Sequence, residues 1–326
     1  MKIIDVPQPG GPEALVVAQR PTPIPQDTEV LIEIAAAGIN RADVLQRKGH
    51  YPPPPGAPSY PGLEAAGVIT AVGSAVREFK VGDNVCALLQ GGGYAEYCTV
   101  DEGQVLPIPG ALTMIQAASL PEAYFTVWSN VFGFGRMQAG ETLFVHGGSS
   151  GIGVAAIQLA SALGYTVFTT AGTDDKCRFC EQLGAKRAIN YKTQDFVQMI
   201  AEQTGKRGVD VLLDMVGGSY LSRNISCLAP EGRLVIIATQ SGSKGEADLL
   251  RILQRRLVVT GSALRPREVA FKRAIKAQLL DVVWPLLARG AIKPIVDRVF
   301  PLDRASDAHA YMESSVHRGK IVLDTK

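Results

Sequence analysis

The strongest structural signal in this sequence is the run Phe144-Val145-His146-Gly147-Gly148-Ser149-Ser150-Gly151-Ile152-Gly153. It reads as an apolar strand that enters a glycine-rich turn and continues into a helix of small residues. Glycines let a backbone approach a pyrophosphate closely, and a helix N-terminus offers free N–H groups and the positive end of the helix dipole. The run therefore predicts a dinucleotide-binding loop. Ser150 stands where the usual pattern has its middle glycine, so a βα turn without ligand is the alternative.

The next strand predicts which dinucleotide is bound. An NAD enzyme usually carries an acid at the end of this strand, where it holds the ribose 2′-hydroxyl. Here the position is Ala171 or Gly172, and Lys176 follows one helical turn later. No carboxylate at that position would repel a 2′-phosphate, so the expected cofactor is NADPH. Asp174 and Asp175 fit the ordinary pattern of acids in the first turn of a helix.

The sequence around the loop alternates between strands and helices. Strands are expected at residues 142–146, 165–170, 188–191, 209–214 and 233–238, with helices at 152–163 and up to residue 183. This alternation is typical of an α/β fold with a doubly wound parallel sheet. Residues 30–105 instead contain short β segments, interrupted by a proline-stiffened loop at 51–56. The C-terminus returns to a strand, a helix and a strand at 298–300, 303–314 and 320–323.

Composition excludes several classes of protein. The 326 residues are 46% apolar and 20% charged, which is a globular balance and sufficient for two domains. A formal charge of +2 gives no electrostatic reason to bind nucleic acid or an anionic membrane. There is no signal-peptide pattern at the N-terminus and no apolar run long enough for a membrane span. The five cysteines are scattered, which fits reduced thiols in the cytoplasm.

Four further blocks precede the loop in order, and together they carry a family resemblance. They are residues 37–43 (AGINRAD), 61–69 (PGLEAAGVI), 81–85 (VGDNV) and 92–97 (GGYAEY). With the glycine run they resemble the medium-chain dehydrogenase/reductases, and within these the quinone oxidoreductases. Residues 45–52 and 260–265 look like the subgroup induced by the tumour-suppressor pathway in animals.

The resemblance implies an architecture and a chemistry. A GroES-like β-rich substrate domain would comprise residues 1–121 and 294–326, and a Rossmann NADPH-binding domain residues 122–293. The active site would lie in the cleft between them and reduce a small quinone-like molecule by hydride transfer. The family usually forms a homodimer that pairs edge strands, here near residues 257–262.

The metal positions of this superfamily are changed in this chain. Its alcohol dehydrogenases bind catalytic zinc with a Cys in the first block and a His in the second, where this sequence has Asn40 and Leu63. Leucine has no ligand atom, and an amide is a poor zinc ligand beside thiolate and imidazole. The four closely spaced cysteines of the structural zinc lobe are also missing. No metal is therefore expected, as in the quinone reductases.

The resemblance also implies site residues. Asn40, whose amide can donate to a carbonyl oxygen, and Tyr51, on the proline loop, match the active site. The alternative for Tyr51 is a surface aromatic packed on prolines, and for Lys176 and Tyr191 a solvated charge and a strand-end aromatic. Glu64 and Glu122 form either a residual acid pair or ordinary structural contacts. The expected cofactor contacts are Thr126, Gly148, Ser149, Ser150, Gly151, Ile152, Gly153, Gly172, Lys176, Tyr191, Gln240, Leu264, Arg265 and Arg318.

Other chemical residues carry weaker signals. Cys177 and Cys180 form a lone C-x-x-C within a predicted helix, which favours incidental helical cysteines over a metal or redox site. His146 precedes the loop inside an apolar strand, so a structural histidine is expected. His309 and His317 have no nucleophile near them in sequence and receive no role.

Three functions besides quinone reduction fit parts of this pattern. The nearest is an enoyl-thioester reductase of the same superfamily, in which a tyrosine resembling Tyr51 protonates the substrate carbon. A short-chain dehydrogenase is excluded because no Tyr-x-x-x-Lys occurs and the glycine run lies in the middle of the chain. A non-enzymatic NADPH-binding protein remains open, and turnover of NADPH with an ortho-quinone distinguishes it from an enzyme.

Overall fold

The chain packs as two units in the computed structural model, which describes all 326 residues. One unit joins Met1–Phe125 to Arg265–Lys326, and the other is Thr126–Leu264. Residues 265–293, which sequence analysis assigned to the Rossmann domain, pack here with the N-terminal residues. Side-chain contacts explain this packing, because Trp284 Nε1 donates to Pro107 O at 2.7 Å and Lys276 Nζ donates to Glu102 O at 2.9 Å. The domain boundaries as such stay a prediction.

The unit Thr126–Leu264 is built on a six-stranded sheet in which every neighbouring pair is parallel. Its first strand leads into the glycine run, as predicted. The order β10-β9-β8-β11-β12-β13 places the first strand, β8, inside the sheet and β13 at one edge. The strands are β8 (Thr142–Val145), β9 (Thr166–Ala171), β10 (Arg187–Asn190), β11 (Val209–Asp214), β12 (Leu228–Ile236) and β13 (Val258–Gly261).

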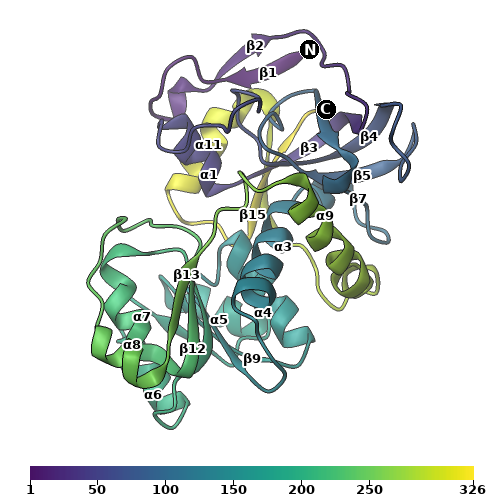
Figure 1. Ribbon diagram of the computed structural model, residues 1–326. Helices are drawn as coiled ribbons and strands as arrows, with labels where there is room; N and C mark the ends of the chain where they lie inside the picture. The colour runs from purple at the N-terminus through teal and green to yellow at the C-terminus, as the bar shows by residue number, and fades with distance from the viewer. The chain divides into compact units, whose positions relative to one another are not determined.

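Helices cover both faces of this sheet, so the predicted doubly wound Rossmann arrangement is confirmed. One group packs on β8, β9 and β10; in the other, two helices pack on β12 and the third packs against one of them and on β10 (Figure 1). Several helices begin at a side-chain cap: Thr173 Oγ1 accepts from Lys176 N, and Asp195 Oδ1 accepts from Val197 N. The first group is α4 (Gly151–Ala162) and α5 (Asp174–Gln182), and the second is α6 (Phe196–Gln203), α7 (Leu221–Cys227) and α8 (Leu249–Arg255).

The other unit is built on a mainly antiparallel seven-stranded sheet. Its path runs β14-β15-β3-β4-β5-β7, with β6 also paired to β3. Alternate residues of β3 and β4 enter a core that includes Val30, Ile32, Ile34 and Ile69. This confirms the predicted GroES-like β domain. The strands are β3 (Glu29–Ile39), β4 (Glu64–Val72), β5 (Asn84–Leu88), β6 (Tyr97–Asp101), β7 (Val105–Pro107), β14 (Val296–Pro301) and β15 (Lys320–Asp324).

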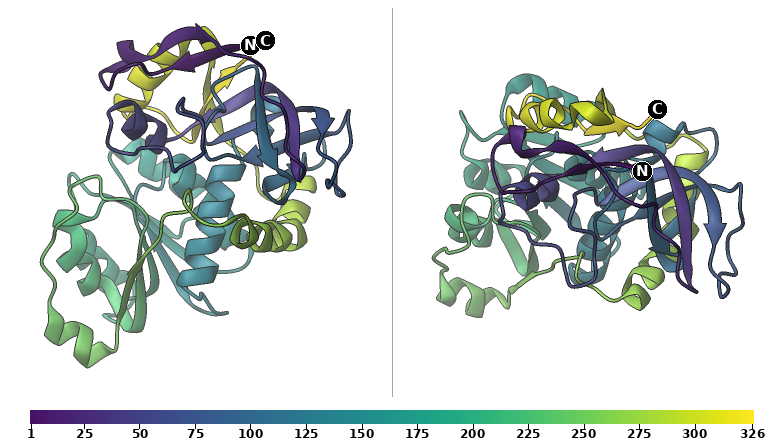
Figure 2. Two further views of the ribbon diagram at one scale, coloured as in Figure 1. Left: turned by 45° about the horizontal axis from the view of Figure 1, so that its top comes forward. Right: turned by 90° about the horizontal axis from the view of Figure 1, so that it is seen from above.

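The two ends of the chain meet in this unit. Strand β15 pairs antiparallel with β3, and α11 packs on β15 and on the N-terminal segment, so that yellow and purple ribbons lie together in Figure 2. This pairing brings Ile321 opposite Ile39, one residue before Asn40. The remaining strands and α-helices are β1 (Lys2–Asp5), β2 (Val16–Gln19), α1 (Arg41–Arg47), α2 (Met114–Ala117), α3 (Pro121–Val127), α9 (Val269–Gln278), α10 (Trp284–Ala288) and α11 (Ala305–Glu313). There are also two π-helices, η3 (Trp128–Phe134) and η5 (Leu279–Val283), and four 3-10 helices, η1 (Pro12–Ala14), η2 (Glu102–Gln104), η4 (Gly218–Tyr220) and η6 (Leu302–Arg304).

None of the helices combines the length and the apolar character that crossing a bilayer requires.

Candidate functional site

The glycine loop, residues 147–153, holds its shape through its backbone. Gly153 packs so closely on the strand side of the loop that a Cβ there would lie 2.3 Å from Gly147 O. Ser150 caps α4, because its Oγ accepts from Gly153 N at 3.1 Å. The N–H groups of Ser149, Gly151 and Ile152 have no acceptor within the protein. A loop of this kind fits a dinucleotide pyrophosphate, since it offers N–H donors at a helix N-terminus and no side-chain obstruction.

No acidic side chain without a partner lies at the end of β9. A Cβ at Gly172 would lie 2.8 Å from Tyr191 Oη, so the glycine makes room for that ring, which is 44% exposed. Asp174, the acid closest to this position, is engaged by Asn190, whose Nδ2 donates to Asp174 Oδ1 at 2.7 Å. Asp175 pairs with Arg178 on the helix surface. The end of β9 therefore has no carboxylate without a partner that could hold a ribose 2′-hydroxyl.

The remaining predicted cofactor residues divide between the two units. Gln240 is exposed, and its N–H donates to Met215 O at 3.4 Å, while Met215 Sδ accepts from Ser150 Oγ at 3.9 Å. The structure thus brings Gln240 close to the glycine loop. Thr126 and Leu264 lie at the two ends of the Rossmann unit and are mostly buried. Arg265 and Arg318 belong to the GroES-like unit.

Asn40 lies where β3 ends and α1 begins, inside a group of charged side chains that we call the Asn40 cluster. Lys320, at the start of β15, donates through Nζ to Asn40 Oδ1 at 2.7 Å and to Glu64 Oε1 at 2.5 Å. Asn40 Nδ2 donates to the same Glu64 oxygen at 2.9 Å. The other Glu64 oxygen accepts from Glu122 N at 2.9 Å. The members are Asn40, Asp43, Glu64, Glu122 and Lys320.

Two acids of this cluster have raised pKa values. Burial raises the pKa of Asp43 to about 6, although N–H donors from Asn40 and Gly62 oppose the shift. Burial, and then the carboxylate of Glu64, raise the pKa of Glu122 to about 8. Glu122 lies beside the Glu64 carboxylate and is mainly protonated at neutral pH. The residual-acid-pair interpretation fits this geometry.

Tyr51 stands beside the cluster with its hydroxyl free of protein partners. Its ring lies under the guanidinium of Arg265, 5.2 Å from centroid to Cζ. Arg265 is itself fixed, because its Nε donates to Gln90 O at 2.7 Å. Burial and then the charge of Glu122 raise the pKa of Tyr51 to about 12. The phenol therefore stays protonated at physiological pH and can donate a hydrogen bond to a bound oxygen.

Sequence reasoning missed three buried charged residues of this site. Asp43 is fully buried, Lys320 is 6% exposed, and Lys272 is fully buried with its Nζ donating to Arg265 O at 3.1 Å. Burial lowers the pKa of Lys272 to about 8. The one available signal was Lys320, a charged residue placed directly before the apolar strand residues Ile321–Leu323. Charges are rarely buried unless they are paired, so such a position points to a partner.

The residues with weak sequence signals have structural contacts. His146 is buried, with Nδ1 3.0 Å from Thr170 Oγ1 and Nε2 2.8 Å from Asn224 Oδ1. Burial lowers its pKa to about 4, so it is neutral. Cys177 and Cys180 are buried free thiols, and no group of three or more His, Cys, Asp and Glu side chains is arranged to hold a metal ion. His309 is also buried, with its Nε2 2.9 Å from Tyr94 Oη.

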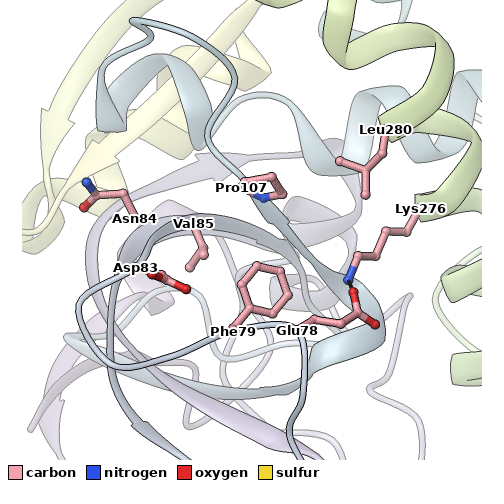
Figure 3. Close-up of a pocket in the computed structure, with 8 residues that line it drawn as sticks. All are labelled: Glu78, Phe79, Asp83, Asn84, Val85, Pro107, Lys276 and Leu280. Carbon is pink, nitrogen blue, oxygen red and sulfur yellow. Dashed lines mark hydrogen bonds and ion pairs between the residues drawn. The ribbon is translucent and has the colours of Figure 1, made fainter.

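A separate pocket lies in the GroES-like unit (Figure 3). Its cation, Lys276, is already engaged by Glu78 Oε2 at 2.6 Å and lies 4.8 Å from the ring centroid of Phe79. No predicted site residue lines it, so it is distinct from the Asn40 cluster. The lining residues are Glu78, Phe79, Asp83, Asn84, Val85, Pro107, Lys276 and Leu280.

Comparisons with known proteins place these features in a family. The model described as "Alcohol dehydrogenase GroES-like domain" matches residues 26–110, and the one described as "Zinc-binding dehydrogenase" matches residues 183–323. A quinone oxidoreductase of Sus scrofa is 33% identical over 323 residues, covering 96% of this chain and 94% of the relative.

Two solved structures add to the comparison. The Escherichia coli quinone oxidoreductase complexed with NADPH has a TM-score of 0.89 against this chain. The two are 31% identical, and the match covers 99% of this chain and 100% of that one. The CurK enoyl reductase has a TM-score of 0.87 at 29% identity, covering 99% of this chain and 98% of that one.

Proposed function

This chain belongs to the medium-chain dehydrogenase/reductase superfamily as a quinone-oxidoreductase-like, NAD(P)H-dependent reductase, and from this premise we propose that it reduces quinones of the ortho-quinone type with NADPH. The observation that carries the proposal is the pair of donors at the Asn40 cluster. The Asn40 amide and the Tyr51 hydroxyl each have a hydrogen without a protein acceptor, and no metal-ligand set accompanies them. Such donors suit a substrate that is already a strong electrophile.

NADPH, when bound, supplies the hydride, so that quinone, NADPH and one proton give hydroquinone and NADP⁺. The chain's own part is to hold the quinone oxygen by Asn40 and Tyr51 as it gains negative charge. The added proton ends on that oxygen, which exchanges protons readily with water. No side chain therefore needs to deliver a proton to a carbon atom of the substrate. Binding in a fixed orientation supplies the rest of the rate enhancement.

The preference for NADPH is supported by the surroundings of Gly172. The glycine removes the acid that would repel a 2′-phosphate, Tyr191 Oη lies next to it, and Lys176 belongs to the first turn of the helix that follows. The E. coli quinone oxidoreductase structure was solved with NADPH. We propose that the cofactor contacts are Thr126, Gly148, Ser149, Ser150, Gly151, Ile152, Gly153, Gly172, Lys176, Tyr191, Gln240, Leu264, Arg265 and Arg318.

Zinc is not part of this proposal, although one matching family model is named for it. The residues at the metal positions do not fit the ion: Asn40 Oδ1 and Glu64 Oε1 are already bonded to the Lys320 ammonium, and Leu63 has no ligand atom. A second cation beside a buried ammonium would be repelled.

We propose that the protein is a homodimer of the cytoplasm. Strand β13 is an edge strand with Val258 and Val259 37% and 41% exposed, which supports a homodimer formed by pairing this edge with its copy. All five cysteines are free and buried, which fits the cytoplasm. The sequences of residues 45–52 and 260–265 support membership in the subgroup of quinone oxidoreductases that the tumour-suppressor pathway induces in animals.

Enoyl-thioester reduction is the second candidate, favoured by the similarity to the CurK enoyl reductase and by the presence of Tyr51. Its chemistry needs an acid that protonates carbon, and general acids work best with a pKa near the working pH. A phenol with a pKa of about 12 is poorly suited to that task. The similarity to quinone oxidoreductases, at 33% and 31% identity, also supports quinones as the first candidate.

Purified protein, analysed for bound metal, tests the function with 9,10-phenanthrenequinone as acceptor and NADPH or NADH as donor. We expect oxidation of one NADPH per quinone, slower reaction with NADH, and no stoichiometric zinc. Absence of turnover with any ortho-quinone, despite NADPH binding, would favour the non-enzymatic alternative. Loss of activity on chelation, with zinc present, would contradict the metal-free site.

A further inference from the structure

Lys320 is a buried ammonium whose hydrogen-bonding capacity is fully used inside the protein. Its Nζ donates to Ile39 O at 3.0 Å, to Asn40 Oδ1 at 2.7 Å and to Glu64 Oε1 at 2.5 Å. An ammonium has three hydrogens, and these contacts account for all of them. Lys320 therefore has no donor left for a substrate, and it acts on the reaction only through the groups that it touches.

The contact with Asn40 fixes which way the side-chain amide points. The oxygen faces the ammonium, and Nδ2 faces the carboxylate of Glu64 at 2.9 Å. The flipped amide would set NH₂ against the ammonium and oxygen against the carboxylate, and both contacts would be repulsive. Lys320 and Glu64 together thus permit one orientation of Asn40.

That orientation leaves one N–H of Asn40 for a ligand. The first Nδ2 hydrogen is used by Glu64, while the second has no acceptor within the protein, and the side chain is half-buried rather than enclosed. Because the ammonium withdraws electron density from Oδ1, it polarises the amide and strengthens this remaining donor. The effect is largest when the bound oxygen becomes negative, which is the condition for stabilising a transition state rather than a ground state.

We propose that Lys320 is a positioning residue that orients and polarises the Asn40 amide, so that a charge at the start of the last strand strengthens the donor to the substrate oxygen. This inference rests on the proposed function for its kinetic consequence, but the orientation of the amide is a property of the protein alone. Glu64 holds both partners and compensates the buried positive charge.

The first test is a double-mutant cycle on quinone turnover. Lys320→Met keeps the aliphatic stem and removes the donors. We expect kcat to fall about ten- to hundredfold, which is less than the 10²–10³-fold that loss of a direct donor costs. KM should stay within about threefold of the wild-type value. In an Asn40→Ala background the same substitution should change kcat less than about twofold. An equal loss in both backgrounds would overturn the proposal, because Lys320 would then act independently of Asn40.

Two further variants separate this effect from stability. Lys320→Met with Glu64→Gln avoids an unpaired buried carboxylate, and kcat should again fall if the double variant folds. Lys276→Met is the matched control, because Lys276 is also buried and bonded to a glutamate, Glu78, but lies at the pocket of Figure 3. It should lower the unfolding temperature without changing kcat; a loss of kcat equal to that of Lys320→Met would overturn the proposal.

A spectroscopic test needs no activity. The chain has only five asparagines, so selective ¹⁵N labelling gives few side-chain signals, and the Asn40 pair is identified by its loss in Asn40→Ala. Lys320→Met should shift that pair, whereas Lys276→Met should not. An unchanged Asn40 signal in Lys320→Met would overturn the proposal. If the signal shifts but the wild type reduces no quinone, the amide orientation is supported and the proposed function fails.

Discussion

The glycine loop and the Asn40 cluster hold their atoms in place by different forces. The loop is made by neighbours in sequence: Ser150 caps the helix that begins one residue later, and Gly153 packs on Gly147. The cluster is made by residues far apart, since Lys320 and Glu64 are separated by 256 positions. Backbone contact forms the first, and compensating buried charges form the second.

This difference determines which substitutions each region tolerates. In the loop, the identity of a side chain matters less than whether a Cβ fits between two backbone segments. In the cluster, volume matters less than charge, because removing one member leaves another buried and unpaired. A change that harms one region should therefore leave the other intact.

The largest effect is expected at Gly153. A Cβ in Gly153→Ala would lie 2.3 Å from Gly147 O and 2.5 Å from Gly148 Cα, so α4 must move away from the loop. Overpacking of this kind costs about 1–3 kcal/mol and sometimes more, and NADPH affinity should fall about a hundredfold. Fluorescence titration with NADPH measures it.

Gly133→Ala is the control for this substitution in the same unit. Its Cβ would meet only Trp128 O at 3.9 Å, so the NADPH dissociation constant should stay within about twofold. Equal affinity in Gly153→Ala and Gly133→Ala would show that the close approach of the loop has no role in cofactor binding.

How much could be predicted from sequence follows from the same contrast. The β8–α4 unit, the parallel sheet and the short strands of residues 30–105 were predictable, because periodicity and glycine spacing are local signals. The GroES-like arrangement of those strands came from the family resemblance. Asn40 was found by family resemblance. Lys320, Asp43 and Lys272 were missed, since neither burial nor a partner hundreds of residues away is visible in a local pattern. The packing of residues 265–293 was missed for the same reason: helical spacing does not say which sheet a helix covers.

A smaller effect is expected at Lys176, which tests the charge at the edge of the cofactor site. Lys176→Ala should weaken NADPH binding by about 1–3 kcal/mol, the range for a charge-assisted contact, and leave NADH affinity nearly unchanged. Isothermal titration with both cofactors measures the difference. If both weaken equally, Lys176 supports the fold of α5 rather than recognising the 2′-phosphate.

The pH dependence of turnover tests the electrostatics of the cluster. Glu122, with a pKa of about 8, is neutral below that pH and becomes negative above it. A new negative charge beside Tyr51 opposes negative charge on the substrate oxygen, so kcat should fall as the pH rises through 8, by about three- to tenfold at pH 9. Glu122→Gln should remove this decline.

The control for the pH profile is Glu13→Gln, at an exposed glutamate of the same unit, which should keep the wild-type profile. If Glu122→Gln retains the decline, another group titrates; Lys272, with a pKa lowered to about 8 by burial, would then be the one to replace next.

The smallest effect on quinone turnover is expected at Tyr51, and it separates the two enzymatic functions. Tyr51→Phe removes a hydroxyl that positions the quinone oxygen but leaves the Asn40 donor, so turnover of 9,10-phenanthrenequinone should fall only a few-fold. An enoyl thioester needs a proton at carbon, where loss of a positioned acid costs about 10²–10⁴-fold. Wild type and variant are therefore compared with the quinone and with crotonyl-CoA. Surviving quinone turnover with negligible thioester activity in both proteins is the expected result. Strong thioester reduction in the wild type that collapses a hundredfold in the variant would assign Tyr51 as a proton donor, despite its pKa of about 12, and make enoyl reduction the function.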